Sequence, residues 1–199
     1  MNGSENKFGI RTTYAGCNFR SRLEAKWARF FDLVGWKWEY EPCDFNGWIP
    51  DFVLIGATQI TYAEVKPIPP IVELPTEVIK QIDNSGCDEE VIILGIGVSE
   101  RDRFGWMREK YDDGWGWGRA AFGFWRIGNF GFCSEQGRYS DRISGTYDGG
   151  GWGRGDFSDV GGWLMKMLKQ SGNEVQWNPQ SDPRIARLMP PRQQFRVSD

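Results

Sequence analysis

Two β-rich segments constrain the fold of this chain more than any other feature. They are residues 49–55 (IPDFVLI) and 60–66 (ITYAEVK), and four residues separate them. Short apolar segments joined by a loop of this length are typical of a β-hairpin. The sequence therefore predicts an antiparallel pair in which Ile55 lies opposite Ile60.

This register has a chemical consequence, because it sets Asp51 directly opposite Glu64. Directly opposed residues share one face of a sheet, with Cβ atoms about 4.5 to 5.5 Å apart. Side chains alternate along a strand, so Lys66 points the same way as Glu64. We therefore expect two carboxylates and one lysine to gather on one face of the hairpin.

The segments around the hairpin predict a mixed α/β sheet flanked by helices. Apolar residues with helical spacing indicate a helix, alternating aromatic and charged residues indicate a half-buried strand, and a continuous apolar run indicates a strand buried on both faces. In chain order these elements are a helix over 19–34, a strand over 36–42, the hairpin, a helix over 75–84 and a strand over 91–98.

The second half of the chain has a different composition, with 17 of the 26 glycines and 7 of the 11 tryptophans after residue 100. We expect a core over residues 1–105 and a Gly/Trp-rich extension over 106–199 that packs on it. Within the extension we expect a hairpin over 119–133, a loop over 138–156, a helix over 159–171 capped by Ser158 and a basic tail over 183–197.

The absence of histidine limits the chemistry. With 0 His in 199 residues, Ser-His-Asp and Cys-His catalysis and His-based zinc sites are excluded. The four cysteines are too far apart in sequence for a metal knuckle. No apolar run is long enough for a membrane span, and the first residues do not look like a signal peptide, so we expect a cytoplasmic protein.

Carboxylates, lysine and a hard cation remain, and they suffice for phosphodiester hydrolysis. Mg²⁺ prefers oxygen ligands and keeps several waters. Asp51 and Glu64 can bind it, with the backbone carbonyl of Val65 as a further ligand. Lys66 can orient or help to deprotonate the attacking water.

These residues also resemble a known signature. Pro50-Asp51 followed by Glu64-Val65-Lys66 resembles the PD-(D/E)XK motif, and Glu24 resembles the acidic position in the first helix of that superfamily. The string FRSRLEAKWARFFD…WEYEP…PDF…EVK is similar to small nucleases of bacteriophages and prophages.

The resemblance covers roughly residues 14–100 and departs from the pattern at Pro67. It implies a restriction-endonuclease-like core and a Mg²⁺- or Mn²⁺-dependent DNA endonuclease that leaves 5′-phosphate ends. Its roles would be phage-type DNA processing, recombination or degradation. Glu24 would join Asp51, Glu64 and Lys66 as a catalytic residue.

Three alternatives stay open. A Holliday-junction resolvase would need a homodimer to cut two strands symmetrically. A non-catalytic nucleic-acid-binding or virion protein could retain the fold, and the substrate could be RNA.

Three acids also have alternative interpretations. Instead of a catalytic role, Glu24 could form a surface ion pair with Arg20, and the positions of Glu39 and Glu41 favour structural roles.

Candidate DNA contacts come from two regions. Lys80 and Gln81, on the helix after the catalytic strand, could reach the scissile phosphate or form a solvated helix face. Exposed aromatics beside arginines can stack on unpaired bases, although most tryptophans are core residues. The candidates in the extension are Trp115, Trp117, Arg119, Trp152 and Arg154.

Overall fold

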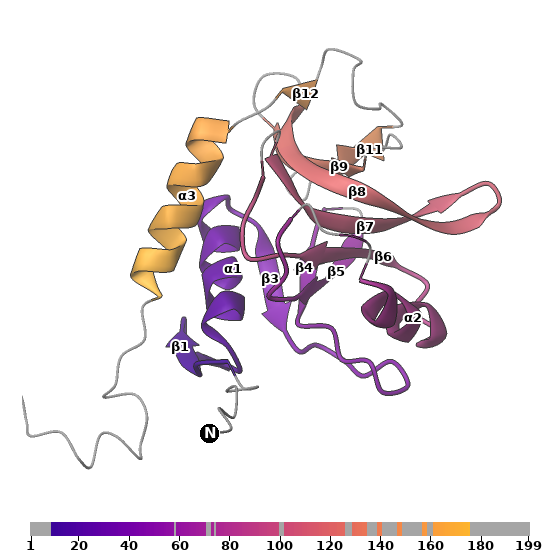
Figure 1. Ribbon diagram of the computed structural model, residues 1–199, viewed down its shortest axis with the longest axis horizontal. Helices are drawn as coiled ribbons and strands as arrows, with labels where there is room; N and C mark the ends of the chain where they lie inside the picture. The colour runs from indigo at the N-terminus through magenta and orange to yellow at the C-terminus, as the bar shows by residue number, and fades with distance from the viewer. Residues whose placement is uncertain are drawn as a thin grey trace, which may run out of the picture.

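One mixed β-sheet runs through most of the chain in the computed structural model, with helices on both faces (Figure 1). The structure describes residues 9–57, 59–70, 73, 75–99, 102–125, 129–134, 139–140, 147–148, 157–158 and 161–175. The helices of this part are α1 (Arg22–Leu33), α2 (Thr76–Asn84) and α3 (Gly161–Glu174). The strands are β1 (Thr12–Tyr14), β2 (Cys17–Phe19), β3 (Lys37–Tyr40), β4 (Phe52–Ile55), β5 (Ile60–Val65), β6 (Glu90–Leu94), β7 (Arg103–Tyr111), β8 (Gly114–Trp125), β9 (Asn129–Ser134), β10 (Tyr139–Ser140), β11 (Tyr147–Asp148) and β12 (Phe157–Ser158).

The strands of the large sheet are ordered β11-β10-β9-β8-β7-β6-β5-β4-β3, and β12 pairs with β8. Strands β5 and β6 run parallel, while the other neighbours are antiparallel. The predicted mixed α/β sheet flanked by helices is therefore confirmed. The boundary expected at residue 105 falls inside β7, which joins β6 and β8 in the same sheet.

The hairpin of β4 and β5 has the predicted register. Ile55 pairs with Ile60 and Phe52 pairs with Ala63. The backbone N–H of Gly56 donates to the carbonyl of Gln59 at 2.9 Å and closes the loop. Asp51 directly precedes β4, so the same register continues to Glu64.

Two hydrophobic cores lie on opposite faces of the sheet. Helices α1 and α3 cover one face side by side, and α2 covers the other (Figure 1). Strand β6 contributes Ile92 and Leu94 to the first core and Val91 and Ile93 to the second. It is thus buried on both faces, as the apolar run predicts. No helix in the described residues is long and apolar enough to cross a membrane.

Strand β6 is shorter than the predicted strand over 91–98, which is a correction. It ends at Leu94 because the backbone then turns away from β5. The N–H of Gly95 donates to the carbonyl of Phe104, and the N–H of Ile96 donates to the carbonyl of Ile68. A side chain at Gly95 would lie 2.5 Å from the Ile68 oxygen, so a glycine is needed at this close approach.

The extension contains the predicted hairpin over 119–133 as the pair β8 and β9, although β8 begins at Gly114. The predicted last helix is present as α3, but Ser158 is not at its start. Ser158 belongs to β12, where it pairs with Phe124 of β8, and α3 begins three residues later. Within the expected loop over 138–156 the described residues form β10 and β11. The expected tail over 183–197 lies outside the described residues.

Gly105→Ala tests the close contact between β6 and β7. A Cβ at Gly105 would lie 2.0 Å from the carbonyl oxygen of Ile93, whereas a Cβ at Gly97 meets nothing within 4 Å. We expect Gly105→Ala to lower the free energy of unfolding by about 2 kcal/mol or more. Gly97→Ala should change it by less than about 0.5 kcal/mol. Equal urea midpoints for the two variants would contradict this packing.

Candidate active site

Asp51 and Glu64 meet where β4 begins and β5 ends. Along β4 and β5 alternate residues face opposite cores, and both carboxylates fall on the face that α2 covers, with Val53 and Tyr62. Only 3% of Asp51 and 4% of Glu64 is exposed. Two acids are therefore buried side by side, which costs free energy unless cations or hydrogen-bond donors compensate.

Asp51 is held by one backbone and one side-chain donor. Its Oδ2 accepts a hydrogen bond from the backbone N–H of Val65 at 2.7 Å. Its Oδ1 accepts from Arg20 Nη2 at 2.8 Å. The contact with Val65 ties the start of β4 to the end of β5.

Glu64 is held in the same way by two side chains. Its Oε2 accepts from the indole N–H of Trp48 at 3.0 Å. Its Oε1 forms an ion pair with Lys66 Nζ. Lys66 therefore points the same way as Glu64, as the alternation of the strand predicts, and its side chain is 33% exposed.

A tight turn over residues 45–48 places Trp48. Asn46 and Gly47 both have positive φ angles, 47° and 90°, and the backbones of Phe45 and Trp48 exchange two hydrogen bonds. Asn-Gly favours a turn with positive φ at both central residues. Trp48 was missing from the predicted site, although the Asn-Gly pair was a readable signal for this turn.

Burial and the charge of Glu64 raise the pKa of Asp51 to about 7, with a smaller contribution from Glu24. The hydrogen bond from Val65 and the charge of Lys66 act in the opposite direction. A carboxyl with this pKa changes its protonation state near neutral pH, which is the behaviour of paired acids that share a site.

Glu24 lies close to Asp51 but is occupied by other partners. Its Oε1 accepts from the Ser21 hydroxyl at 2.7 Å, and the backbone N–H of Glu24 donates to that hydroxyl at 3.2 Å. The Ser21 side chain thus caps the start of α1. Its Oε2 accepts from the Tyr40 hydroxyl at 2.6 Å. Burial and this hydrogen bond raise the pKa of Tyr40, so the phenol remains a donor.

Arg20 contacts Asp51 rather than the carboxylate of Glu24. Its guanidinium bridges Asp51 at 2.8 Å and Glu41 at 2.9 Å. The alternative of a surface ion pair with Glu24 is not seen among the described side chains, because only the backbone N–H of Arg20 donates to Glu24. Arg20 and Tyr40 were not predicted as site residues, since Arg20 is 31 residues from Asp51 in the sequence and Tyr40 is 16 residues from Glu24.

The candidates on α2 lie apart from the carboxylates. Lys80 is exposed and pairs with Glu77 at 3.1 Å, which is the solvated helix face considered above. The side chain of Gln81 donates to the carbonyl of Gly47 at 3.1 Å. Gln81 therefore supports the turn that holds Trp48.

The aromatic candidates on β8 are anchored to acids. The indole N–H of Trp115 donates to Asp88 at 2.8 Å, and that of Trp117 donates to Asp83 at 3.1 Å. The guanidinium of Arg119 lies 5.5 Å from the ring centroid of Trp106. None of these contacts joins the carboxylate pair. Trp152 and Arg154 lie outside the described residues.

The donor set fits a hard divalent cation. Among the described residues no group of three or more His, Cys, Asp and Glu side chains is close enough to hold a metal alone. Mg²⁺ needs only one or two carboxylates, because it keeps several waters. Asp51 and Glu64 supply two, and each already binds a cationic side chain that is at least 33% exposed.

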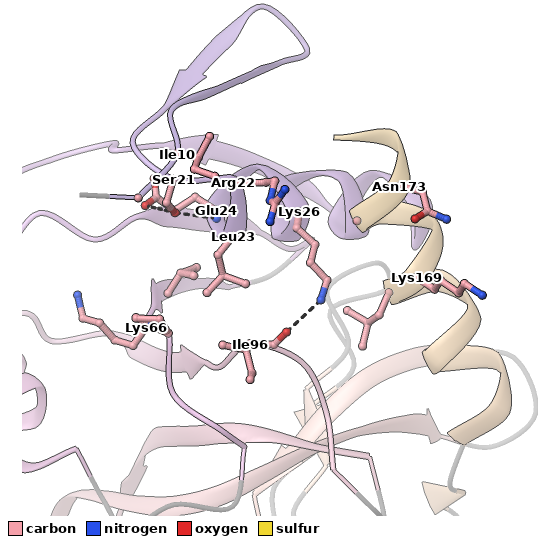
Figure 2. Close-up of a pocket in the computed structure, with 15 residues that line it drawn as sticks. Ile10, Ser21, Arg22, Leu23, Glu24, Lys26, Lys66, Ile96, Lys169 and Asn173 are labelled. Carbon is pink, nitrogen blue, oxygen red and sulfur yellow. Dashed lines mark hydrogen bonds between the residues drawn. The ribbon is translucent and has the colours of Figure 1, made fainter. Parts of the chain in front are cut away.

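A cleft of about 940 Å³ adjoins the site (Figure 2). Glu24, Val65 and Lys66 line it, whereas Asp51 and Glu64 lie outside its lining. The cleft therefore adjoins the site on the side of α1 and meets it at Lys66.

Comparisons with protein-family models, with curated proteins and with solved structures find no match to this chain.

The raised pKa of Asp51 predicts how stability depends on pH. The pKa in the folded protein, about 7, lies above the ordinary value for an aspartate, 3.8. The folded state therefore holds the proton more tightly, and the stability that it contributes is complete below about pH 4 and lost by about pH 7. In EDTA, the free energy of unfolding of the wild type should fall relative to Asp51→Asn by up to about 1.4 kcal/mol per pH unit in this window.

The matched control is Asp112→Asn, at an exposed position in the turn between β7 and β8. Its difference from the wild type should stay constant across the same window. Urea unfolding at several pH values measures both differences. A constant difference between the wild type and Asp51→Asn would show that Asp51 ionises normally.

Proposed function

We propose that this protein is a divalent-metal-dependent DNA nuclease of the PD-(D/E)XK type that hydrolyses phosphodiester bonds and leaves 5′-phosphate ends. The observation that carries the proposal is the register of β4 and β5. It buries Asp51 beside Glu64 and brings Lys66 to the same face. A buried acid pair with a neighbouring lysine is costly to fold, and this cost is explained if the pair binds a cation.

Mg²⁺, or Mn²⁺ in its place, would be held by Asp51, Glu64 and the backbone carbonyl of Val65. When bound, the ion supplies Lewis-acid activation of the phosphate and of a water. Trp48 holds one oxygen of Glu64, and the N–H of Val65 holds one oxygen of Asp51. The second oxygen of each carboxylate, which Arg20 or Lys66 contacts in this structure, would bind the cation once these side chains move away.

Lys66 would act on the attacking water. Its ammonium group lies against Glu64 and is partly exposed towards the cleft. Once a divalent cation takes its place at Glu64, the lysine can donate to the water or to the developing charge on the phosphate. Glu24 would shape the site through its negative charge and through Tyr40, rather than as a first ligand.

The fold supports the finer class as a proposal. The order of α1, β3, the β4–β5 hairpin, α2 and the parallel strand β6 fits a restriction-endonuclease-like core. Strand β5 ends at Val65, directly before Lys66 and Pro67. The catalytic strand is thus short, and Lys66 is outside the strand proper. We propose that it acts in the cytoplasm, in phage-type DNA processing, recombination or degradation.

One observation favours a second candidate, a non-catalytic protein that retains the fold. Arg20 and Lys66 neutralise Asp51 and Glu64 without any metal. In such a protein the four side chains would be a permanent ion-pair network. The two candidates differ in whether a divalent cation can displace the cationic side chains.

Cleavage assays with labelled single-stranded, duplex and branched DNA in Mg²⁺ test the proposal. We expect Asp51→Asn and Glu64→Gln to abolish cleavage, because each removes one of two metal-binding carboxylates. Lys66→Met should retain the metal and lower kcat by about 10² to 10⁴. Cleaved ends should be substrates for a ligase, which requires a 5′-phosphate.

Asp112→Asn is the control and should cleave like the wild type. Circular dichroism should confirm that every variant is folded. Cleavage that persists in folded Asp51→Asn and Glu64→Gln would falsify the assigned site. DNA binding without turnover in Mg²⁺ or Mn²⁺ would favour the non-catalytic candidate.

A further inference from the structure

The cleft beside the site is formed by five separate segments. Residues 9–10, the start of α1, the end of α3, the end of β5 and the turn after β6 surround it, and its volume is about 940 Å³. Clefts of this size are large enough for an extended organic ligand. Lys66 lines one end of the cleft and pairs with Glu64, so a ligand in the cleft would reach the edge of the candidate site.

The lining of the cleft is cationic, although the whole chain has a net charge of −3. Among the described residues, Glu24 is the only acid that lines it. In Figure 2, Lys66 lies at one end, Lys26 lies in the middle and Lys169 lies at the opposite rim. Arg22 adds a further positive charge. This row of cations suits a chain of phosphates that leads to Lys66.

A second hollow of about 540 Å³ continues the cleft along α3. The two hollows share Lys26, Ile96, Leu168 and Lys169. The second adds Met165 and Lys166 and contains no acid among its lining residues. The cationic surface therefore extends well beyond the site.

Exposed apolar side chains gather in the same place. The described residues include four exposed large apolar side chains, Ile10, Ile49, Ile96 and Met165. Three of them, Ile10, Ile96 and Met165, line the two hollows and are 48%, 48% and 54% exposed. A patch that combines exposed apolar groups with cations marks an interaction site rather than a merely solvated face.

Lys26 connects the two kinds of surface. Its Nζ donates to the carbonyl of Ile96 at 3.0 Å, as Figure 2 shows. This contact fixes the ammonium group beside an exposed apolar side chain and leaves its other N–H groups for a ligand. Burial lowers the pKa of Lys26, and a phosphate at this position would favour its charged form.

We propose that the two hollows bind a single-stranded DNA segment. Its phosphates would follow the lysines Lys66, Lys26, Lys169 and Lys166, and its bases would contact Ile96, Met165 and Ile10. A duplex offers phosphates but keeps its base faces stacked, so its bases cannot contact the apolar side chains. A single strand offers both phosphates and exposed base faces. This inference rests on the proposed function and specifies its substrate as a strand with an unpaired segment.

Fluorescence anisotropy in EDTA tests the inference without cleavage. The probes are a labelled oligo(dT) and a duplex of the same length. Wild-type protein should bind oligo(dT) more tightly than the duplex. The double variant Lys166→Ala/Lys169→Ala should weaken oligo(dT) binding about tenfold and reduce the slope of log K against log salt by about 1.4, since each lost single-strand phosphate contact contributes about 0.7.

Two further variants separate charge from apolar contact. Ile96→Ser/Met165→Ser should weaken oligo(dT) binding and leave duplex binding unchanged, because only unpaired bases reach these side chains. Lys37→Ala removes an exposed lysine on the edge strand β3 and should bind like the wild type. Tighter binding of the duplex, or an equal loss in Lys37→Ala, overturns the inference.

The outcomes also separate this inference from the proposed function. If Lys166→Ala/Lys169→Ala still binds oligo(dT) fully while cleavage depends on Asp51, the cleft assignment is wrong and the nuclease stands. If that variant loses oligo(dT) binding but the wild type cleaves no DNA with any divalent metal, the cleft assignment stands and the nuclease proposal is wrong.

Discussion

The pairing of Ile55 with Ile60 is the constraint on which the candidate site depends. Because side chains alternate along a strand, a slip by one residue would turn every side chain of β5 to the opposite face. Such a slip is costly here, since Ala63 and Val65 belong to the core under α1 while Tyr62 belongs to the core under α2. Packing on both faces therefore fixes the register, and the register places Asp51 beside Glu64.

Burying two acids side by side costs free energy, and the cationic ends of two flexible side chains, Arg20 and Lys66, offset this cost. Arg20 is 59% exposed and Lys66 is 33% exposed at the side chain, whereas the acids are almost fully buried. The fixed donors, the Trp48 indole and the Val65 N–H, hold one oxygen of each acid. This division between fixed and movable partners is what the proposed cation site needs, because a divalent ion would replace Arg20 and Lys66 without disturbing the backbone.

Local patterns were sufficient to predict the hairpin, α1, α2 and the position of Lys66, because strand alternation and helical spacing determine them. The contacts of Arg20, Tyr40 and Trp48 could not be predicted, since they depend on how separate elements meet in space. The predicted strand over 91–98 was too long because a backbone turn at Gly95 stops it within an apolar run.

Trp115 and Trp117 looked free beside glycines, but Asp88 and Asp83 come from the neighbouring α2 region to bind them. The cationic cleft was also invisible in the sequence, because Lys26, Lys66 and Lys169 lie on three different elements.

The most direct measurement is calorimetric titration of Mn²⁺ into the wild type near pH 6, in buffers of different ionisation enthalpy. The pKa of Asp51 is raised to about 7, so metal binding should release close to one proton per ion. Asp51→Asn and Glu64→Gln should lose the binding, and Asp112→Asn should keep both the affinity and the proton release. Binding of Mn²⁺ with equal affinity to Asp51→Asn and Glu64→Gln, or no binding to the wild type, would contradict the claim that this carboxylate pair is a metal site.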